Sequence, residues 1–186
     1  MSEEPRAGDA ALAEMRAMIG KPIGTPSVAP DPVNQPMIRH WAAAFEDPNP
    51  VYTDPERAAA SRFGAIVAPP MMLQTWTMPT PRITGIAERG GSPVEQSESP
   101  LAALDRAGFI ATLATNSEFE IVRYLRLGEV ITSTMEIESV SDEKQTRIGR
   151  GHFITWVTTY RDAGGEVVGR QMFRILKFAP DLSALS

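Results

Sequence analysis

Residues Met37 to Trp76 read MIRHWAAAFEDPNPVYTDPERAAASRFGAIVAPPMMLQTW, and this stretch decides the fold. It contains a helical pattern, a tight loop of Asp, Asn and Pro, a second short helical pattern, and an entry through two prolines into a third helix. Proline fixes the backbone and is tolerated in the first turn of a helix, where its missing N–H had no partner anyway. We therefore expect this stretch to form the active-site half of the domain.

The first helix of this stretch should begin just before it. Asn34 and Gln35 are candidate capping residues, and Pro36 follows them in the first turn. Apolar residues then recur at helical spacing as far as Phe45. His40 falls beside this apolar face, where a structural or surface histidine is expected.

Two further helices are expected after the loop. Thr53 or Asp54 caps a short one, and the apolar residues 65–68 then form a strand-like piece. Pro69-Pro70 opens the third helix, Met71 to Trp76, which is apolar nearly all round. A helix of this composition is predicted to be buried.

The segments around this stretch are less regular. Residues 1–10 are predicted to be disordered, and residues 11–19 to form a helix that stops at Gly20. Residues 21–33 contain four prolines, so they form either a surface linker or an extended segment with a short strand near Ile23.

An irregular insertion is predicted at residues 78–100, which are rich in Pro, Gly and Ser and have no sustained period. It is too long for an ordinary connector, so a lid, a partner-contact arm or partial disorder are the alternatives. Residues 101–107 should form one helix that ends at Gly108.

The second half of the chain changes to a period of two residues, which is typical of strands. Strands are predicted at residues 116–124, 130–140, 147–160 and 167–178, with a hairpin turn at Asp162–Gly165. These four strands form an antiparallel meander. Together with the buried helix they predict an α+β domain in which the sheet wraps around that helix. Because such a sheet has exposed edges, dimerisation or a partner chain is expected.

Composition narrows the functional class. The 186 residues suffice for one domain with a sizeable core, and the net charge of −5 argues against nucleic acid as the main partner. The sequence has no cysteine, which excludes disulfides, thiolate metal sites and a cysteine nucleophile. No signal peptide and no membrane-spanning apolar run is recognisable, so a soluble cytoplasmic protein is expected.

The Asp-Pro-Asn-Pro loop allows three interpretations. Asp47 and Asn49 can simply bond their own backbone in a structural turn. Alternatively, Asp47 is a positioned acid or base with a histidine within reach. A metal site is the third, but one Asp and one Asn form a poor ligand set, so no metal is expected.

The start of the third helix offers a second chemical feature. Free N–H groups at a helix start stabilise developing negative charge, and here they belong to Met71 and Met72 because prolines have none. An acyl thioester placed there would have its carbonyl polarised, as enolate-forming chemistry requires. A residue near Asp47 would then act on the α and β carbons.

These segments resemble a known family. FEDPNPVYTD, followed by FGAIVAPPMMLQ and later RYLRLGE, is similar to the MaoC-like hydratase/dehydratase family of hot-dog folds. The resemblance covers residues 20–180, with a tail and short helix at 1–19 and a tail at 181–186. DPVNQPMIRHW and VAPPMMLQTWTMP further resemble the large MaoC-like subunit of actinobacterial enoyl-CoA hydratases of steroid side-chain degradation, a part of cholesterol degradation. That domain is often followed by an OB-fold/zinc-ribbon domain, which the 186 residues do not include, so a shortened homologue or a piece of a longer chain is expected.

The family's hydratase motif reads Asp-x-Asn-Pro-x-His. Asp47, Asn49 and Pro50 match it, whereas Tyr52 occupies the histidine position. The Asp/His pair normally activates the water, and a tyrosine with a pKa near 10 is a poor base at neutral pH. The resemblance therefore implies a heterodimer or heterotetramer in which a smaller MaoC-like partner carries the Asp/His pair, while this chain supplies a degenerate half-site.

The leading hypothesis is thus a subunit of a 2-enoyl-CoA hydratase, with a CoA thioester as substrate and no further cofactor. Alternatives are a self-sufficient homodimeric hydratase that uses Asp47, and a non-catalytic acyl-CoA-binding scaffold. The candidate substrate contacts are Asp47, Asn49, Tyr52, Ala68, Met71, Met72 and Trp76. Arg123, Arg126 and Lys177 are candidates for the CoA phosphates only because they are basic and flank strands, and solvated surface charges are the alternative.

Overall fold

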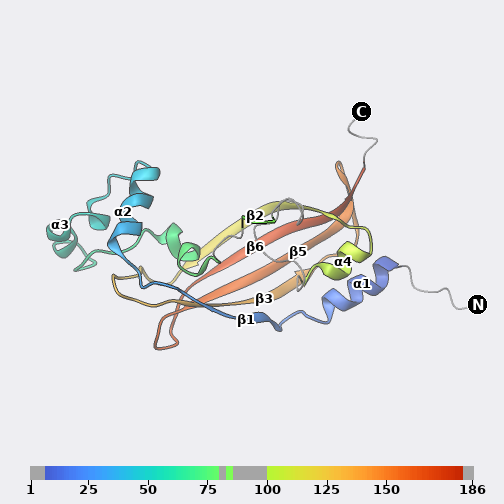
Figure 1. Ribbon diagram of the computed structural model, residues 1–186, viewed down its shortest axis with the longest axis horizontal. Helices are drawn as coiled ribbons and strands as arrows, with labels where there is room; N and C mark the ends of the chain where they lie inside the picture. The colour runs from blue at the N-terminus through green and yellow to red at the C-terminus, as the bar shows by residue number, and fades with distance from the viewer. Residues whose placement is uncertain (1–6, 80–82, 86–99, 182–186) are drawn as a thin grey trace, which may run out of the picture.

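An antiparallel sheet forms the body of the protein (Figure 1). The computed structural model describes residues 7–79, 83–85 and 100–181. Five strands run in the order β1-β3-β5-β6-β2, and the short β4 pairs with β5. The strands are β1 (Pro22–Val28), β2 (Ala111–Ile121), β3 (Thr132–Val140), β4 (Lys144–Thr146), β5 (Gly149–Arg161) and β6 (Val167–Pro180).

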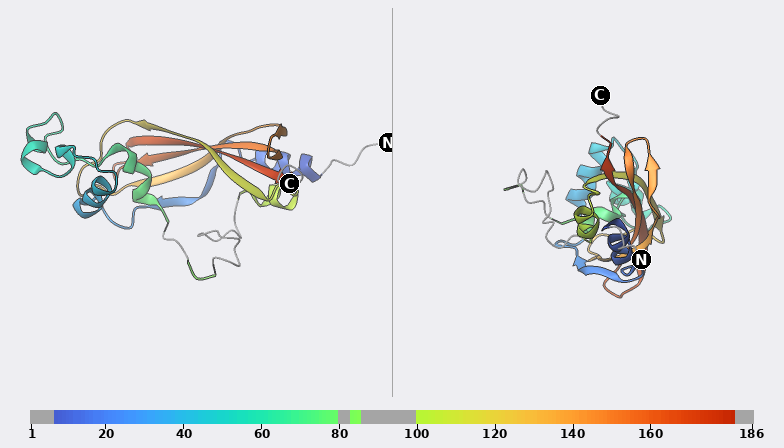
Figure 2. Two further views of the ribbon diagram at one scale, coloured as in Figure 1. Left: turned by 90° about the horizontal axis from the view of Figure 1, so that it is seen from above. Right: turned by 90° about the vertical axis from the view of Figure 1, so that its right-hand side faces the viewer.

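The helices gather at the two ends of this sheet, as Figures 1 and 2 show. Helices α2 and α3 lie beyond one end, and α1 and α4 lie at the other. The α-helices are α1 (Ala7–Arg16), α2 (Gln35–Ala44), α3 (Pro55–Ala59) and α4 (Ala102–Arg106), and the 3₁₀ helices are η1 (Pro50–Tyr52) and η2 (Pro70–Thr77).

Helix η2 buries one face against the sheet. Met72, Leu73 and Trp76 are buried in a cluster that also contains Val168 of β6. Gly169 of β6 leaves no room for a side chain, since an added Cβ would lie 2.7 Å from Leu73 Cδ2. This arrangement confirms the expected α+β class, although the helix is 3₁₀ over its eight residues. A second cluster beneath α1 and α4 includes Phe109 and Ile154.

The predicted meander is wrong for its first strand. β3, β5 and β6 do follow one another as antiparallel neighbours, but β2 pairs with β6 rather than β3. The turn at Gly128 does not close a hairpin, because its N–H donates to the carbonyl of Val33 at 2.8 Å. The connection between β2 and β3 therefore runs past the end of the sheet and pairs with the segment that leads into α2.

Several local predictions are confirmed. Asn34 caps α2, with its Oδ1 accepting from Met37 N at 3.0 Å, and Asp54 caps α3. The β5–β6 turn is held by Asp162, whose Oδ1 accepts from the N–H groups of Gly164 and Glu166. The short strand near Ile23 exists as β1, so the linker alternative is excluded.

Other boundaries differ from the predictions. Helix α1 begins at Ala7, inside the ten residues expected to be disordered, and β2 begins at Ala111 rather than Asn116. The strand-like residues 65–68 form only an isolated bridge, from Val67 to Arg126. Most of the predicted insertion at 78–100 lies outside the described residues. Within the described part of the chain, no helix is both long and apolar enough to cross a membrane.

Candidate functional site

The C-terminal end of α2 sets the direction of the Asp-Pro-Asn-Pro loop that follows it. Asp47 N donates to Ala42 O at 2.9 Å and Glu46 N to Ala43 O at 3.2 Å, the two bonds of a Schellman motif. The motif needs a left-handed residue, and Glu46 takes this position with φ of 52°. Glycine or asparagine usually occupies it, because other side chains are strained there.

The loop itself is a pair of turns made by its own polar side chains. Asp47 Oδ1 accepts from Asn49 N at 3.0 Å, and Asn49 Oδ1 accepts from Val51 N at 3.3 Å. Asn49 thereby caps η1, which the following proline opens. The structural-turn interpretation of the loop is therefore confirmed, and it leaves the second carboxylate oxygen of Asp47 outside that turn.

Tyr52, at the histidine position of the motif, is buried beneath the loop with 6% of its surface exposed. Burial raises the pKa of its hydroxyl, as do the neighbouring Tyr124 and Asp47, whereas a hydrogen bond with the Asn49 side chain opposes the shift. Its backbone is anchored by Gln35, whose Nε2 donates to Tyr52 O at 2.8 Å. A tyrosine with a raised pKa stays protonated at neutral pH and cannot act as a general base.

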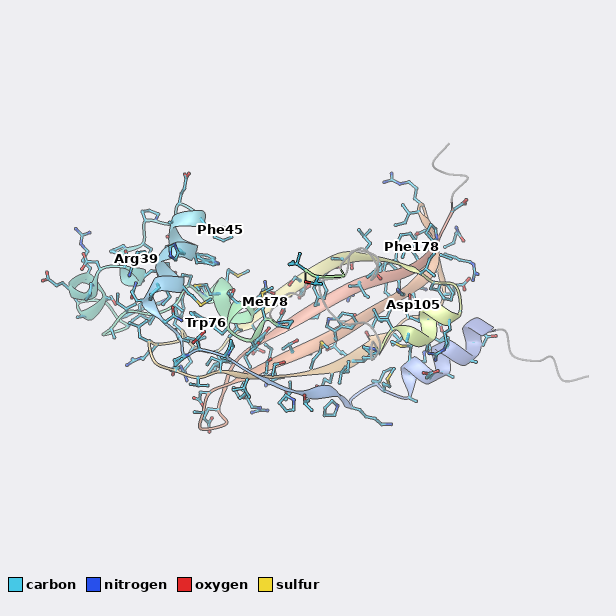
Figure 3. All side chains as sticks on the ribbon, viewed as in Figure 1. Arg39, Phe45, Trp76, Met78, Asp105 and Phe178 are labelled. Carbon is cyan, nitrogen blue, oxygen red and sulfur yellow. The ribbon has the colours of Figure 1, made fainter. Side chains whose placement is uncertain are left out.

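Neither histidine completes an Asp/His pair at this loop. His40 lies exposed on α2, and its side chain makes no hydrogen bond or ion pair within the described residues. His152 lies on β5 opposite Lys177, at the end of the sheet where Figure 3 labels Phe178 and Asp105. It is buried there, and its Nδ1 lies 3.1 Å from Ser141 O. The structure thus brings Asp47 and Tyr52 together without a histidine.

The start of η2 leaves one backbone N–H free. Ala68 N donates to Leu125 O at 2.8 Å, which ties this start to the β2–β3 connection. Met72 N donates to Pro69 O at 3.0 Å, so it is not available as the sequence suggested. Met71 N has no acceptor among the described residues, and the Met71 side chain is half exposed. A carbonyl oxygen placed here would meet a single donor.

The remaining candidate substrate contacts lie in different surroundings. Met72 and Trp76 are buried in the core. The Trp76 indole N–H and the Gln35 Oε1 are buried without a hydrogen-bond partner among the described residues. In the sequence, Gln35 is recognisable only as a candidate helix cap. Its role in anchoring Tyr52 carries no local signal, because the two residues meet only in the fold.

A hollow of about 610 Å³ lies beside η1 and α3. Its lining is mostly apolar and includes Gln35, Ala65, Ile66 and Arg126. An apolar hollow with a few polar groups at its edge suits an organic ligand better than a metal. Among the described residues, no group of three or more His, Cys, Asp and Glu side chains is placed to hold a metal ion.

The three basic residues considered as contacts of the CoA phosphates have different environments. Arg123 pairs with Glu129 at 2.8 Å and Asp162 at 2.7 Å, and these carboxylates raise its pKa. Lys177 is buried and pairs with Asp105 at 2.6 Å, so it is not the solvated charge considered above. Arg126 is exposed, and its Nη2 donates to a backbone carbonyl, that of Phe63.

The chain is similar to several known proteins. A family model described as "FAS1-like, dehydratase domain region" matches residues 17–171. A probable enoyl-CoA hydratase alpha subunit of Thermomonospora curvata is 43% identical over 89% of this chain and 51% of that relative. The 3-oxo-4,17-pregnadiene-20-carboxyl-CoA hydratase alpha subunit of Mycobacterium tuberculosis is 42% identical over 83% and 48%. The chain spans about half the length of these relatives.

Solved structures are also similar to this chain. A chain of the ChsH1-ChsH2 complex from Mycobacterium tuberculosis is 39% identical and superposes with a TM-score of 0.75, covering 92% of this chain and 91% of that one. A MaoC-like dehydratase from Rhodospirillum rubrum, 20% identical with a TM-score of 0.56 over 86% of this chain and 94% of that one, shares the fold. The architecture is therefore the expected hot-dog fold.

Proposed function

The chain belongs to the FAS1-like dehydratase region family, and from this premise we propose that it is a subunit of a heteromeric 2-enoyl-CoA hydratase. In this proposal it supplies a degenerate half-site and part of the acyl pocket. A smaller MaoC-like partner carries the catalytic Asp/His pair. The relatives named as hydratase alpha subunits and the two-component ChsH1-ChsH2 structure support a partner of this kind.

One observation carries the proposal: Tyr52 replaces the histidine of the motif and is buried with a raised pKa. Asp47 keeps its place in the loop but has no base beside it, since His152 lies at the far end of the sheet. Hydration of an enoyl thioester needs a group that takes a proton from water. We infer that this group comes from another chain.

The reaction that follows is the addition of water across the α,β double bond of the thioester. The partner's Asp/His pair takes a proton from the water, and the oxygen attacks the β carbon. Negative charge moves to the thioester oxygen, where N–H groups at the start of the partner's central helix stabilise it. The enolate then takes a proton at the α carbon, which completes the hydration.

The substrate class is proposed from the same relatives. One of them is named for a steroid-derived carboxyl-CoA, and we propose a bulky, steroid-type acyl-CoA here, as in cholesterol degradation. A heterotetramer of two such pairs is the expected assembly. The cytoplasm is its expected location, because a CoA thioester is a soluble metabolite.

The test is hydration of 2-enoyl-CoA by the purified chain, alone and mixed with a small Asp/His-bearing MaoC-like protein of the same organism. Activity is expected only in the mixture. Replacing the partner's motif histidine by alanine should lower the rate roughly 100-fold or more. Asp47→Asn in this chain, which keeps an oxygen for the turn with Asn49 N, should change the rate by less than about twofold.

The opposite result would favour the self-sufficient hydratase. In that case the chain alone hydrates the substrate, and Asp47→Asn abolishes the activity. Tight acyl-CoA binding without turnover, both alone and in the mixture, would instead favour a scaffold.

A further inference from the structure

A second hollow, of about 260 Å³, lies at the C-terminal end of η2, between this helix and strands β1, β3, β5 and β6. Polar but uncharged side chains dominate its wall, together with two methionines. The polar residues that matter here are Gln74, Thr77, Ser133, Thr158, Tyr160 and Gln171. Three of them, Ser133, Tyr160 and Gln171, are nine-tenths buried or more.

Gln171 on β6 organises these groups. Its Oε1 accepts from the Tyr160 hydroxyl at 3.1 Å, and its Nε2 donates to Gln74 Oε1 at 2.9 Å and to Ser117 Oγ at 3.0 Å. All hydrogen-bonding groups of the Gln171 amide are thereby used. The Gln74 amide is consequently held with its oxygen towards Gln171, so its NH₂ group is directed elsewhere.

Two donors of η2 remain available at the hollow. Gln74 Nε2 donates to no acceptor among the described residues. Thr77 Oγ1 accepts from Ser133 Oγ at 3.0 Å, which leaves the proton of the Thr77 hydroxyl free. A 3₁₀ helix has three residues per turn, so Gln74 and Thr77 stand one above the other on one face. Together they offer two donors to one ligand atom.

The lining indicates which atom fits. None of the described lining residues is charged, so a carboxylate or phosphate would lack a counter-charge. A carbonyl oxygen has two lone pairs and no proton, which matches two donors. Met78 and Met135 line the same hollow and suit an apolar body around that oxygen.

The position of the hollow connects it to the proposed reaction. The free Met71 N–H lies at the other end of η2, six residues before Thr77. At a rise of about 2.0 Å per residue, the two ends are separated by roughly 12 Å along the helix. An acyl group whose thioester oxygen is bound at the partner's helix start would run along this length of η2 and place its far end in the hollow.

We infer that this hollow is a distal acyl subsite, in which Gln74 and Thr77 recognise an uncharged carbonyl oxygen at the far end of a long or polycyclic acyl group. The inference rests on the proposed function, since it assigns to this chain the far end of the same substrate whose thioester the partner's helix start binds. It makes Gln74 and Thr77 specificity-determining residues and Gln171 a positioning residue.

The test uses the complex with its smaller subunit and two 2-enoyl-CoA substrates of equal length, one with a ketone at the far end and one with a methylene there. Gln74→Leu and Thr77→Val should each lower kcat/KM for the ketone substrate about tenfold. Neither should change kcat/KM for the methylene substrate by more than about twofold. Thr75→Val is the matched control, because Thr75 does not line the hollow, and it should leave the ratio of the two rates unchanged.

Three outcomes would overturn the subsite. These are equal losses on both substrates, unchanged rates on both, or a wild-type complex that does not prefer the ketone. Failure of the proposed function is seen separately, as no turnover of either substrate. In that case, calorimetry measures the binding of the two corresponding saturated acyl-CoAs. Tighter binding of the ketone compound that Gln74→Leu removes supports the subsite, and equal affinities overturn it.

Discussion

Tyr160 shows how one buried side chain makes the fold sensitive to pH. It lies on β5 with 3% of its surface exposed, and burial raises its pKa to about 12 from 10.0. The folded protein therefore holds this proton more tightly than the unfolded chain does. The resulting stability is fully present below pH 10 and is lost as the pH rises towards 12.

We expect the wild type to lose about 2 to 3 kcal/mol of unfolding free energy relative to Tyr160→Phe between pH 9 and pH 12. At neutral pH the variant should be less stable by about 1 kcal/mol, because its partner Gln171 Oε1 loses a donor. Urea denaturation of both proteins across this pH range measures the difference. Parallel stability curves would show that Tyr160 ionises equally in both states.

At the scale of single residues, the sequence predicted hydrogen bonds between close neighbours in the chain. It did not predict contacts between residues that lie far apart in the chain. The turn formed by Asp47 and Asn49 was predicted because each side chain bonds a backbone group two residues away. The burial of Lys177 was missed because its partner Asp105 is 72 positions distant in the chain. The same holds for Gln35, which meets Tyr52 only after α2 and η1 have packed.

The contact between η2 and the sheet depends on Gly169 of β6. A Cβ at this position would lie 2.7 Å from Leu73 Cδ2 and 2.8 Å from Glu120 O of β2. The end of the Leu73 side chain can move away. The Glu120 carbonyl is less free to move, because it belongs to β2, which is paired with β6. Gly169→Ala should therefore lower the free energy of unfolding by about 1 to 3 kcal/mol, as overpacking does.

Thermal and urea unfolding would measure this loss, with Gly8→Ala in α1 as the control. There the added Cβ would lie 3.7 Å from the Phe109 ring, an ordinary contact. The control should keep or slightly raise stability, by up to about 1 kcal/mol, because alanine favours a helix. Equal stability of Gly169→Ala and the wild type would mean that η2 and β2 can both give way.

Helices and strands that are marked by residues at their ends were predicted better than the pairing of the strands. Helix α2 was placed correctly because Asn34 and Pro36 mark its start. The position of β2 beside β6 could not be read from alternation, since the period of two residues indicates a strand and not its neighbour. The 3₁₀ form of η2 was likewise missed, because an apolar stretch after two prolines is compatible with either helix type.

On the scale of the whole molecule, the sheet has two edges that differ in chemistry. β1 carries Pro22 and Pro26, which lack an N–H, and Gly24 in a left-handed conformation, and its pairing with β3 is irregular. β2 has eleven residues without proline or glycine, and Leu113 on it is 48% exposed. Since prolines protect an edge from further pairing, β2 is the edge open to a partner strand.

We therefore expect the proposed smaller subunit to extend the sheet along β2. Leu113→Lys should weaken its association at least tenfold, because a charge on an edge opposes strand addition, while the unfolding of the isolated chain stays unchanged. Val28→Lys on β1, where the valine is 61% exposed, is the matched control and should leave association unchanged. Sedimentation of the mixed subunits measures both, and a loss confined to Val28→Lys would place the partner on β1 instead. Under the proposed function the base comes from another chain, and the edge that this experiment identifies then determines from which side that base approaches.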